Sequence, residues 1–224
     1  MGYYSVYPKF HVSVDCIIFG FKAGKISLLL LKRNFEPAKG HWSLMGGFVQ
    51  EDESVDDAAR RVLAQLTGLT DVYMDQVEAF GSLGRDSGER VISVAYYALI
   101  NQDDYDHELV RSHNAFWISI DQLPDLIFDH NEMVEKALRR MRNKASTRPI
   151  VFDLLPKEFT LTKLQSLYES IYGEPLDKRN FRKQVALLPC IEKTGLIDKS
   201  ESKRGAALYH YNEDVFRKTR IFKL

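Results

Sequence analysis

Four carboxylates lie close together in the sequence between a glycine pair and the first turn of an expected helix. The pair is Gly46-Gly47, and the carboxylates are those of Glu51, Asp52, Glu53 and Asp57. Oxygen ligands of this kind bind Mg²⁺, and a bound Mg²⁺ can polarise a pyrophosphate and activate water against it. Metal-assisted hydrolysis is therefore the chemistry that this segment could perform, provided that its carboxylates converge on one point.

The same segment resembles the Nudix box of pyrophosphohydrolases. That pattern is a Gly, five residues, a Glu, seven residues, and then Arg-Glu-aliphatic-x-Glu-Glu-x-Gly-aliphatic. The residues that fall in register are Gly47, Glu53, Arg61, Leu63, Gly68 and Leu69. The preceding Trp42-Ser43-Leu44-Met45-Gly46-Gly47 resembles the family's approach to the box. The resemblance implies metal-binding carboxylates at three helix positions, and these positions hold Val62, Gln65 and Leu66.

These three helix positions decide what the segment can do. Positions i, i+3 and i+4 lie on one face of a helix, so three carboxylates there would hold Mg²⁺ against a pyrophosphate. Valine, glutamine and leucine carry no negative charge, and Glu53 is expected to pair with Arg61 and to hold the loop. We therefore predict no hydrolysis, no bound metal and no cofactor. The alternative is a Nudix hydrolase of a nucleoside-diphosphate sugar such as ADP-ribose, using the four carboxylates named above.

The elements that must position this box belong to an α-β layered domain, expected over residues 1–146. Strands are predicted at residues 11–19, 26–32, 42–49, 77–83, 91–100 and 115–119. Ser54 is expected to cap a helix that ends at Gly68, with Asp57 in the capping-box position. Asp129 is expected to cap a second long helix, with Glu132 in the box position. The predicted fold class is α+β, a Nudix α-β-α sandwich with a mixed sheet followed by a winged helix.

A catalytically inactive Nudix fold can still bind a ligand in its cleft, beside the glycine loop. Polar and aromatic residues from the expected loops could line this cleft. Any one of them can also be an ordinary solvated loop residue, and Trp42 can equally belong to the core. As a group they are the predicted effector site: Arg33, Glu36, Lys39, His41, Trp42, Asp86, Glu89 and Arg90.

The polar segment 143–149 marks the predicted boundary with a second domain, residues 147–224. Thr160 is expected to cap a helix to Tyr172, and Asp177 a second helix over residues 178–188, stopped before Pro189. Two short strands follow, at residues 195–199 and 207–211. A helix, a turn, a helix and a hairpin are typical of a winged-helix domain.

The charge distribution agrees with a nucleic-acid partner for this second domain. Residues 146–224 carry a net charge of +5 and residues 1–145 a net charge of −5, although the whole chain is neutral. Arginine can read guanine edges, asparagine suits adenine, and lysine and helix N-termini hold phosphates. The predicted DNA-binding residues are Thr160, Thr162, Lys163, Lys178, Arg179, Asn180, Arg182, Lys183, Lys203 and Arg204.

Three motifs make the resemblance closer. They are Leu126-Ile127-Phe128-Asp129-His130, Phe159-Thr160-Leu161-Thr162, and the run from Leu176 to Arg182. Together with the altered box they resemble the Nudix-related transcriptional regulators, and most of all the arabinose-utilisation branch. The resemblance implies a homodimer on a palindromic double-stranded operator, with an effector in the Nudix cleft. The expected wing, Lys203-Arg204-Gly205-Ala206, departs from the Arg-Gly-Arg-Pro that is frequent in the family.

We therefore predict a sugar-responsive repressor of pentose or arabinose catabolism. Its effector is expected to be L-arabinose or a related sugar, or else ADP-ribose. A nucleotide- or protein-binding adaptor, with the winged helix contacting protein, is a further alternative. Cys16 and Cys190 lack metal spacing, and the N-terminus has neither a signal peptide nor a membrane span, so a cytosolic protein without a membrane partner is expected.

Overall fold

The computed structural model describes residues 3–200 and 204–224 of the chain, and its N-terminal part is built on one mixed sheet. The strands are β1 (His11–Lys22), β2 (Lys25–Lys32), β3 (Trp42–Ser43), β4 (Met45–Phe48), β5 (Tyr73–Phe80), β6 (Val91–Asn101) and β7 (Ala115–Ser119). Their order is β3-β2-β1-β6-β5, with β4 also paired to β1 and β7 to β2. β1 runs parallel to β6, and the other pairs are antiparallel, which makes the sheet mixed as predicted.

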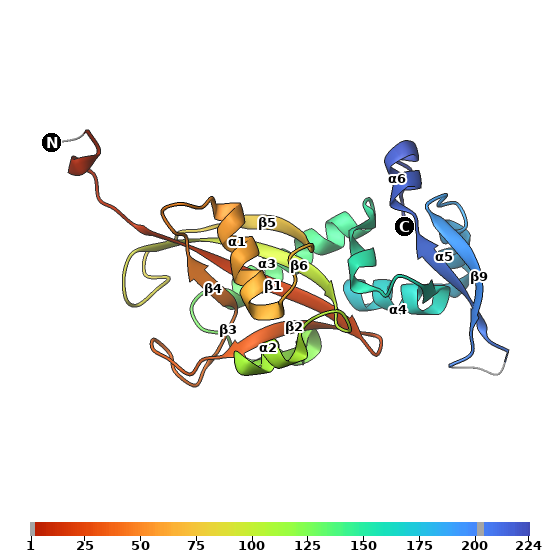
Figure 1. The fold of residues 1–224 in the computed structure, drawn as a ribbon, viewed down its shortest axis with the longest axis horizontal. Helices are drawn as coiled ribbons and strands as arrows, with labels where there is room; N and C mark the ends of the chain where they lie inside the picture. Colours follow the sequence, from red (N-terminus) through yellow and green to blue (C-terminus); the bar gives the residue numbers. More distant parts are fainter. Residues whose placement is uncertain (1–2, 201–203) are drawn as a thin grey trace.

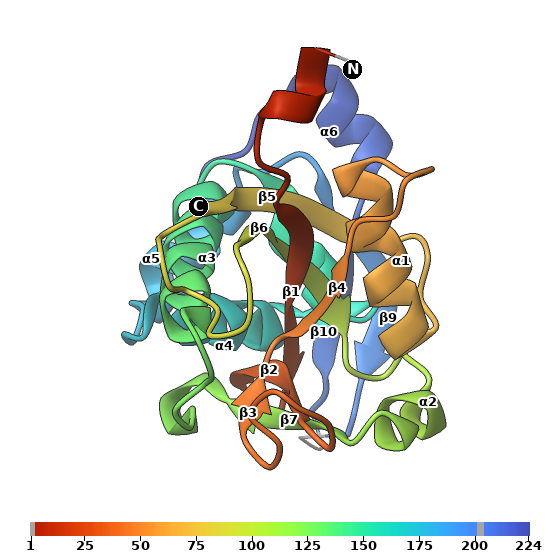
Figure 2. The same cartoon turned by 90° about the vertical axis from the view of Figure 1, so that its left-hand side faces the viewer.

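The sheet is covered on both faces, because the apolar residues of β1 point to alternate sides. Cys16 and Ile18 pack under helix α1 (Val55–Thr67), whereas Ile17 and Phe19 join the larger core on the other side. Figure 2 shows α1 and helix α3 (His130–Ala145) on opposite sides of the strands. A short helix, α2 (His107–Ser112), precedes β7. The α-β-α layering predicted from the sequence is therefore present.

The C-terminal part contains a helix pair and a small sheet. A 3-10 turn (Pro149–Leu154) leads to β8 (Phe159–Thr160), α4 (Leu161–Tyr172), α5 (Lys178–Val185), β9 (Ile191–Asp198), β10 (Ala206–Tyr211) and α6 (Glu213–Thr219). Two further 3-10 turns lie at Tyr3–Val6 and Ile120–Gln122. Along the chain, the β9–β10 hairpin follows the second helix, and the strands form a sheet in the order β8-β10-β9. This is a winged-helix arrangement. Figure 1 shows this unit at the end of the molecule opposite the N-terminus.

The two parts share one hydrophobic core. Phe19 and Leu28 of the sheet, Met141 of α3 and Leu164 of α4 belong to the same buried cluster. Hydrogen bonds also join the parts, since the Tyr168 hydroxyl donates to the Ala145 carbonyl at 3.0 Å. The winged-helix unit is thus held firmly against the end of α3, and the domain boundary at residue 146 stays a prediction. No helix of the described ranges is long and apolar enough to cross a membrane.

Several local predictions need correction. The strand expected at residues 77–83 lies at Tyr73–Phe80, and the helix expected to reach residue 188 ends as α5 at Val185. Ser54, Thr160 and Asp177 cap their helices as predicted. Asp129 makes no side-chain capping bond, because its carboxylate is held by a distant arginine. The short helices α2 and α6 were not predicted at all.

Candidate functional sites

The face of α1 that carries carboxylates in the Nudix box is a packing face in this chain. Val62 is 3% exposed and Leu66 is 1% exposed, and both pack beneath the sheet, whereas Gln65 is exposed. A Cβ atom added to Gly47 would lie 3.0 Å from Val62 Cγ2, so the glycine loop rests on this valine. Together Val62, Gln65 and Leu66 offer a single neutral amide oxygen, that of Gln65, and no carboxylate, which does not fit a Mg²⁺ site.

Two of the four nearby carboxylates, Glu53 and Asp57, have partners of their own, and Glu51 and Asp52 are exposed. Glu53 binds Arg61 at two points, with Arg61 Nε 2.8 Å from Oε2 and Nη2 2.6 Å from Oε1. The Arg61 hydrogen bonds hold the pKa of Glu53 at about 2. The Asp57 carboxylate accepts from the hydroxyl of Ser54, which caps α1, and Asp56 accepts from the Tyr96 hydroxyl. Within residues 3–200 and 204–224, no group of three or more His, Cys, Asp or Glu side chains could hold a metal ion. The predicted structural role of Glu53 is confirmed.

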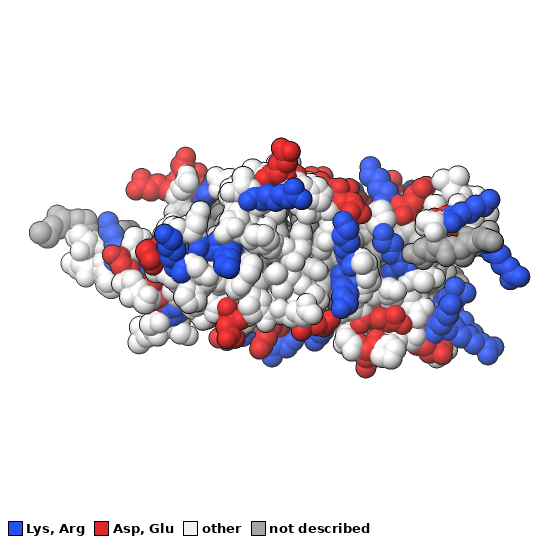
Figure 3. Space-filling view, turned by 90° about the horizontal axis from the view of Figure 1, so that it is seen from below, with Lys and Arg blue, Asp and Glu red and all other residues white. Residues whose placement is uncertain are grey.

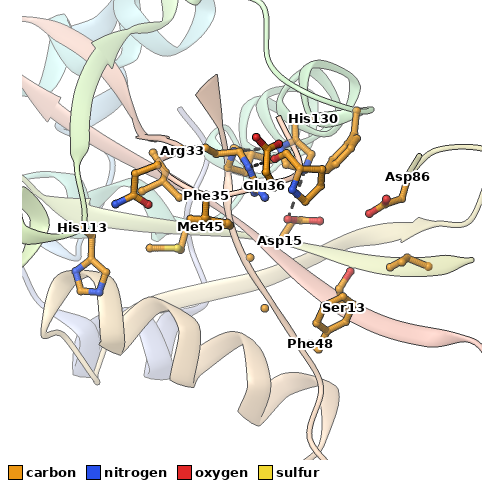
Figure 4. Close-up of a pocket in the computed structure, with 18 of the residues that line it drawn as sticks. Ser13, Asp15, Arg33, Phe35, Glu36, Met45, Phe48, Asp86, His113 and His130 are labelled. Carbon is orange, nitrogen blue, oxygen red and sulfur yellow. Dashed lines mark hydrogen bonds and ion pairs between the residues drawn. The ribbon is translucent and has the colours of Figure 1, made fainter. Parts of the chain in front are cut away.

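A cavity of about 530 Å³ lies beside the glycine loop, between β1, β4 and the loops that follow β2 and β5. Of the predicted effector residues, Arg33, Glu36 and Asp86 line it. Figure 4 shows Arg33 and Glu36 on one side of the cavity and Asp86 on the other. Phe35, Phe48 and Phe128 add aromatic surface to the lining. The cavity combines apolar walls with a few charged groups, which is typical of small-molecule sites.

The other five predicted effector residues do not line this cavity. Trp42 is half-buried, with its ring edge-on to Phe116 at 5.8 Å. Glu89 accepts from His11 at 2.9 Å, and Arg90 donates to the Ser82 carbonyl at 3.0 Å. The two remaining residues, Lys39 and His41, are exposed on the loop after β2.

A buried polar cluster at the floor of the cavity was missed by the sequence analysis. Arg85 donates to both oxygens of Asp129, from Nε to Oδ2 at 2.8 Å and from Nη2 to Oδ1 at 2.7 Å. Its Nη2 also lies 3.7 Å from Asp15 Oδ2, an oxygen that accepts from the Ser93 hydroxyl at 2.6 Å. His130 Nε2 lies 3.6 Å from Asp15 Oδ1. The cluster therefore joins β1, the loop before β6, β6 itself and the start of α3.

The electrostatics of this cluster follow from its burial. Desolvation lowers the pKa of His130, because a buried imidazolium loses its hydration. The Asp129 hydrogen bonds and the neighbouring carboxylates outweigh desolvation at Arg85 and raise its pKa. A signal for Asp15 was present in the sequence, since it is the lone carboxylate in the apolar strand 14–19. Buried charges of this kind need partners, so Asp15 indicated a nearby cation or hydrogen-bond donor without identifying which one.

The glycine loop approaches Asp15 so closely that a side chain has no room. A Cβ atom at Gly46 would lie 2.4 Å from Asp15 Oδ1 and 2.8 Å from the Val14 carbonyl oxygen. Backbone atoms cannot yield as a flexible side chain can. Gly46 is therefore required where β4 pairs with β1, opposite Asp15.

Helix α5 presents a basic face that is separate from its buried face. Phe181 and Val185 are buried, as predicted, and so is Leu188 after the helix. The opposite side forms a shallow hollow lined by Lys178, Arg179, Arg182, Lys183 and Ala186. Figure 3 shows Lys and Arg side chains projecting at the end of the molecule that carries the winged helix. This surface is the candidate nucleic-acid interface, because an exposed basic helix can enter the major groove.

The remaining predicted DNA-binding residues are placed around this face. Asn180 lies to one side of it, lining a different hollow with Tyr172 and Gln184. Thr160 is 8% exposed and caps α4 by accepting from the Lys163 N–H, whereas Thr162 and Lys163 are exposed. In the hairpin, Arg204 is exposed, and Lys203 lies outside the described residues.

Comparison with known protein families and structures agrees with this architecture. Residues 9–140 match the NUDIX domain model, and residues 151–211 match the NrtR DNA-binding winged helix domain. The ADPR responsive transcriptional repressor NtrR of Acinetobacter baylyi is 35% identical and covers 92% of this chain and 84% of its own length.

Two crystal structures from Shewanella oneidensis are also similar. NrtR complexed with a 27mer DNA has a TM-score of 0.82 and 28% identity, covering 95% of this chain and 97% of its own. The NUDIX domain of NrtR complexed with ADP ribose has a TM-score of 0.53 and 28% identity, covering 60% of this chain and 90% of its own. This chain therefore belongs to the NrtR-like family, in which a Nudix domain is followed by an NrtR DNA-binding winged helix domain.

Proposed function

We propose that this protein is a DNA-binding transcriptional repressor whose Nudix domain binds ADP-ribose without hydrolysing it. The observation that carries the proposal is the exposed basic face of α5, around Arg179 and Arg182, on a matched NrtR winged helix. Packing of Val62 and Leu66 at the box positions supports binding rather than catalysis.

ADP-ribose replaces the pentose that was predicted as effector. The arabinose branch was inferred from overall similarity, and it gains no support from the A. baylyi repressor, which is described as ADPR responsive. The cavity volume of about 530 Å³ is in the range of ligand sites that take molecules of this size. Arg33 supplies a positive charge at the cavity wall for the diphosphate.

Helix α3 is the proposed connection between effector and DNA. At its N-terminal end, His130 lines the cavity, and Asp129 binds the cavity residue Arg85. Near its other end, Arg142 Nε donates to the Ile171 carbonyl of α4 at 2.6 Å. A ligand that favours one position of α3 over another would therefore reposition the winged helix, provided that its affinity differs between the two states.

The functional unit is proposed to be a homodimer on a palindromic operator. A single α5 reads only a few base pairs, and winged-helix dimers place two such helices on half-sites about one helical turn apart. The two-fold symmetry of the operator then matches the symmetry of the dimer. Its mass in solution, measured by light scattering, tests this part of the proposal.

Two binding measurements test the function directly. Thermal shift with ADP-ribose, NAD and L-arabinose should raise Tm with ADP-ribose alone, because a ligand of the folded state stabilises it by mass action. Duplex DNA selected by the full chain from a random pool should bind with an affinity that falls steeply with salt. Salt-insensitive retention would favour a protein-binding adaptor, and ADP-ribose cleavage at an ordinary enzymatic turnover would favour the hydrolase.

A further inference from the structure

The floor of the cavity presents a hydrogen-bond donor and an acceptor that face each other across a small gap. The Leu44 N–H donates to His130 Nδ1 at 3.1 Å, so the proton of the neutral ring lies on Nε2. Nε2 lies 3.6 Å from Asp15 Oδ1, which is longer than a hydrogen bond. Figure 4 shows the His130 ring directed at the Asp15 carboxylate. An oxygen atom beside this pair could bond to both groups.

Both groups are buried and yet open to the cavity. His130 is 4% exposed and Asp15 is 7% exposed, and both residues line the cavity. A buried donor or acceptor that lacks a well-formed bond is costly, so a ligand atom that completes both bonds gains more than it would at an exposed site. The position of Asp15 is also fixed, since the Ser93 hydroxyl and the close approach of Gly46 hold it.

The surrounding charges select the kind of ligand group that fits this gap. A cation is opposed by the Arg85 guanidinium, whose Nη2 lies 3.7 Å from Asp15 Oδ2. An anion is opposed by the carboxylates of Asp15 and Asp129. A hydroxyl is neutral and can accept from His130 Nε2 while it donates to Asp15 Oδ1.

We propose that Asp15 and His130 together recognise a sugar hydroxyl of the bound effector, and so determine the specificity of the cavity for a ribose-bearing ligand. The proposal rests on the proposed function, because ADP-ribose supplies such hydroxyls. Neither residue belongs to the Nudix box, so this recognition is independent of the lost carboxylates. Asp15 and His130 bind the sugar, and Arg33 at the cavity wall binds the diphosphate.

The test compares ADP-ribose with analogues that each lack one ribose hydroxyl, by isothermal titration calorimetry on the full chain. The native protein should reject at least one deoxy analogue on the order of 10- to 100-fold, as expected for a hydrogen bond to a charged group. The ratio of the Kd for this analogue to the Kd for ADP-ribose should fall close to one in Asp15→Asn and in His130→Asn. In His130→Asn, the amide oxygen can still accept from the Leu44 N–H, so only the Nε2 donor is removed.

Asp103→Asn is the matched control, because Asp103 is an exposed aspartate that pairs with Lys22 and does not line the cavity. Its ratio should equal that of the native protein. If the two test variants weaken all ligands equally and leave the ratio unchanged, Asp15 and His130 serve only the fold, and the proposal is wrong.

A separate outcome distinguishes this proposal from the proposed effector. If ADP-ribose does not bind to the native protein, the effector assignment fails. The affinities for D-ribose, L-arabinose and 2-deoxy-D-ribose are then compared in the same way. If the native protein binds 2-deoxy-D-ribose more weakly than D-ribose, and both variants abolish this difference, the proposed hydroxyl site is supported. Absence of binding by any of these sugars would overturn it.

Discussion

Arg85 and Asp129 form a two-point ion pair that joins the loop before β6 to the start of α3. Their nitrogen–oxygen distances are 2.8 and 2.7 Å, and the Arg85 side chain is only 3% exposed. Because the Asp129 carboxylate accepts from Arg85, it makes no capping bond to α3. The ion pair instead fixes the start of α3 to the loop beside the cavity. If α3 connects effector and DNA as proposed, the stability of the fold and the response to a ligand depend on the same residues.

Removal of one member of this pair should be strongly destabilising. Arg85→Ala leaves the carboxylates of Asp15 and Asp129 buried without their cation, which should cost about 3–5 kcal/mol of unfolding free energy. Urea unfolding followed by circular dichroism measures this cost. Arg60→Ala is the control, because its ion pair with Asp57 is exposed and its loss should have a much smaller effect on stability. Equal effects of the two substitutions would contradict the structural role of Arg85.

His130 should make the stability of the protein depend on pH. Its pKa is lowered in the folded state, so the unfolded chain binds the proton more readily. The full stabilising contribution is present above the ordinary pKa of 6.5, and it is lost as pH falls below that value towards the folded-state pKa. One such group changes the unfolding free energy by at most about 1.4 kcal/mol per pH unit. In urea titrations between pH 7.5 and 5, His130→Asn should have a shallower dependence than the native protein, and identical slopes would refute the assignment.

The α5 face should determine DNA affinity. Arg179→Ala or Arg182→Ala should cost about 1–3 kcal/mol if the arginine reads a base, and Lys183→Ala should lower the slope of log affinity against log salt by about one. Fluorescence anisotropy with the selected duplex measures both effects. Lys218→Ala on α6 is an exposed control outside the hollow on α5 and should leave affinity unchanged. Native affinity in both arginine variants would discredit α5 as the recognition helix.

ADP-ribose binding should not require a divalent metal. The box positions Val62, Gln65 and Leu66 offer no carboxylate, and Glu53 is committed to Arg61. Calorimetry in EDTA and in Mg²⁺ should give the same Kd, and a chromatographic assay for AMP and ribose 5-phosphate, the products of pyrophosphate cleavage, should detect no turnover in either buffer. A Kd that tightens at least tenfold with Mg²⁺ would show that a metal site has been relocated elsewhere in the cavity.

Much of the fold could be predicted because its signals are local. The Nudix-box register, the caps at Ser54, Thr160 and Asp177, and the buried face of α5 all depend on residues a few positions apart. The short helices α2 and α6 escaped prediction, because six or seven residues carry too little periodicity to distinguish them from turns.

The cavity was predictable only in part, because its floor depends on long-range contacts. Arg85 and Asp129 are 44 positions apart, and Asp15 and Ser93 are 78 apart. Glu89 lies in the same loop as Asp86 and carries the same charge, but it accepts from His11 and does not line the cavity. Sequence spacing alone contains no information about which of these side chains converge.

The most direct test of the account is the affinity of the full chain for its selected duplex, with and without saturating ADP-ribose at matched salt. The effector should change the Kd at least fivefold, the lower end of ordinary allosteric coupling, and Arg85→Ala should reduce this change. Equal DNA affinity with and without ADP-ribose, at a concentration that saturates the cavity, would contradict a Nudix domain that controls the winged helix.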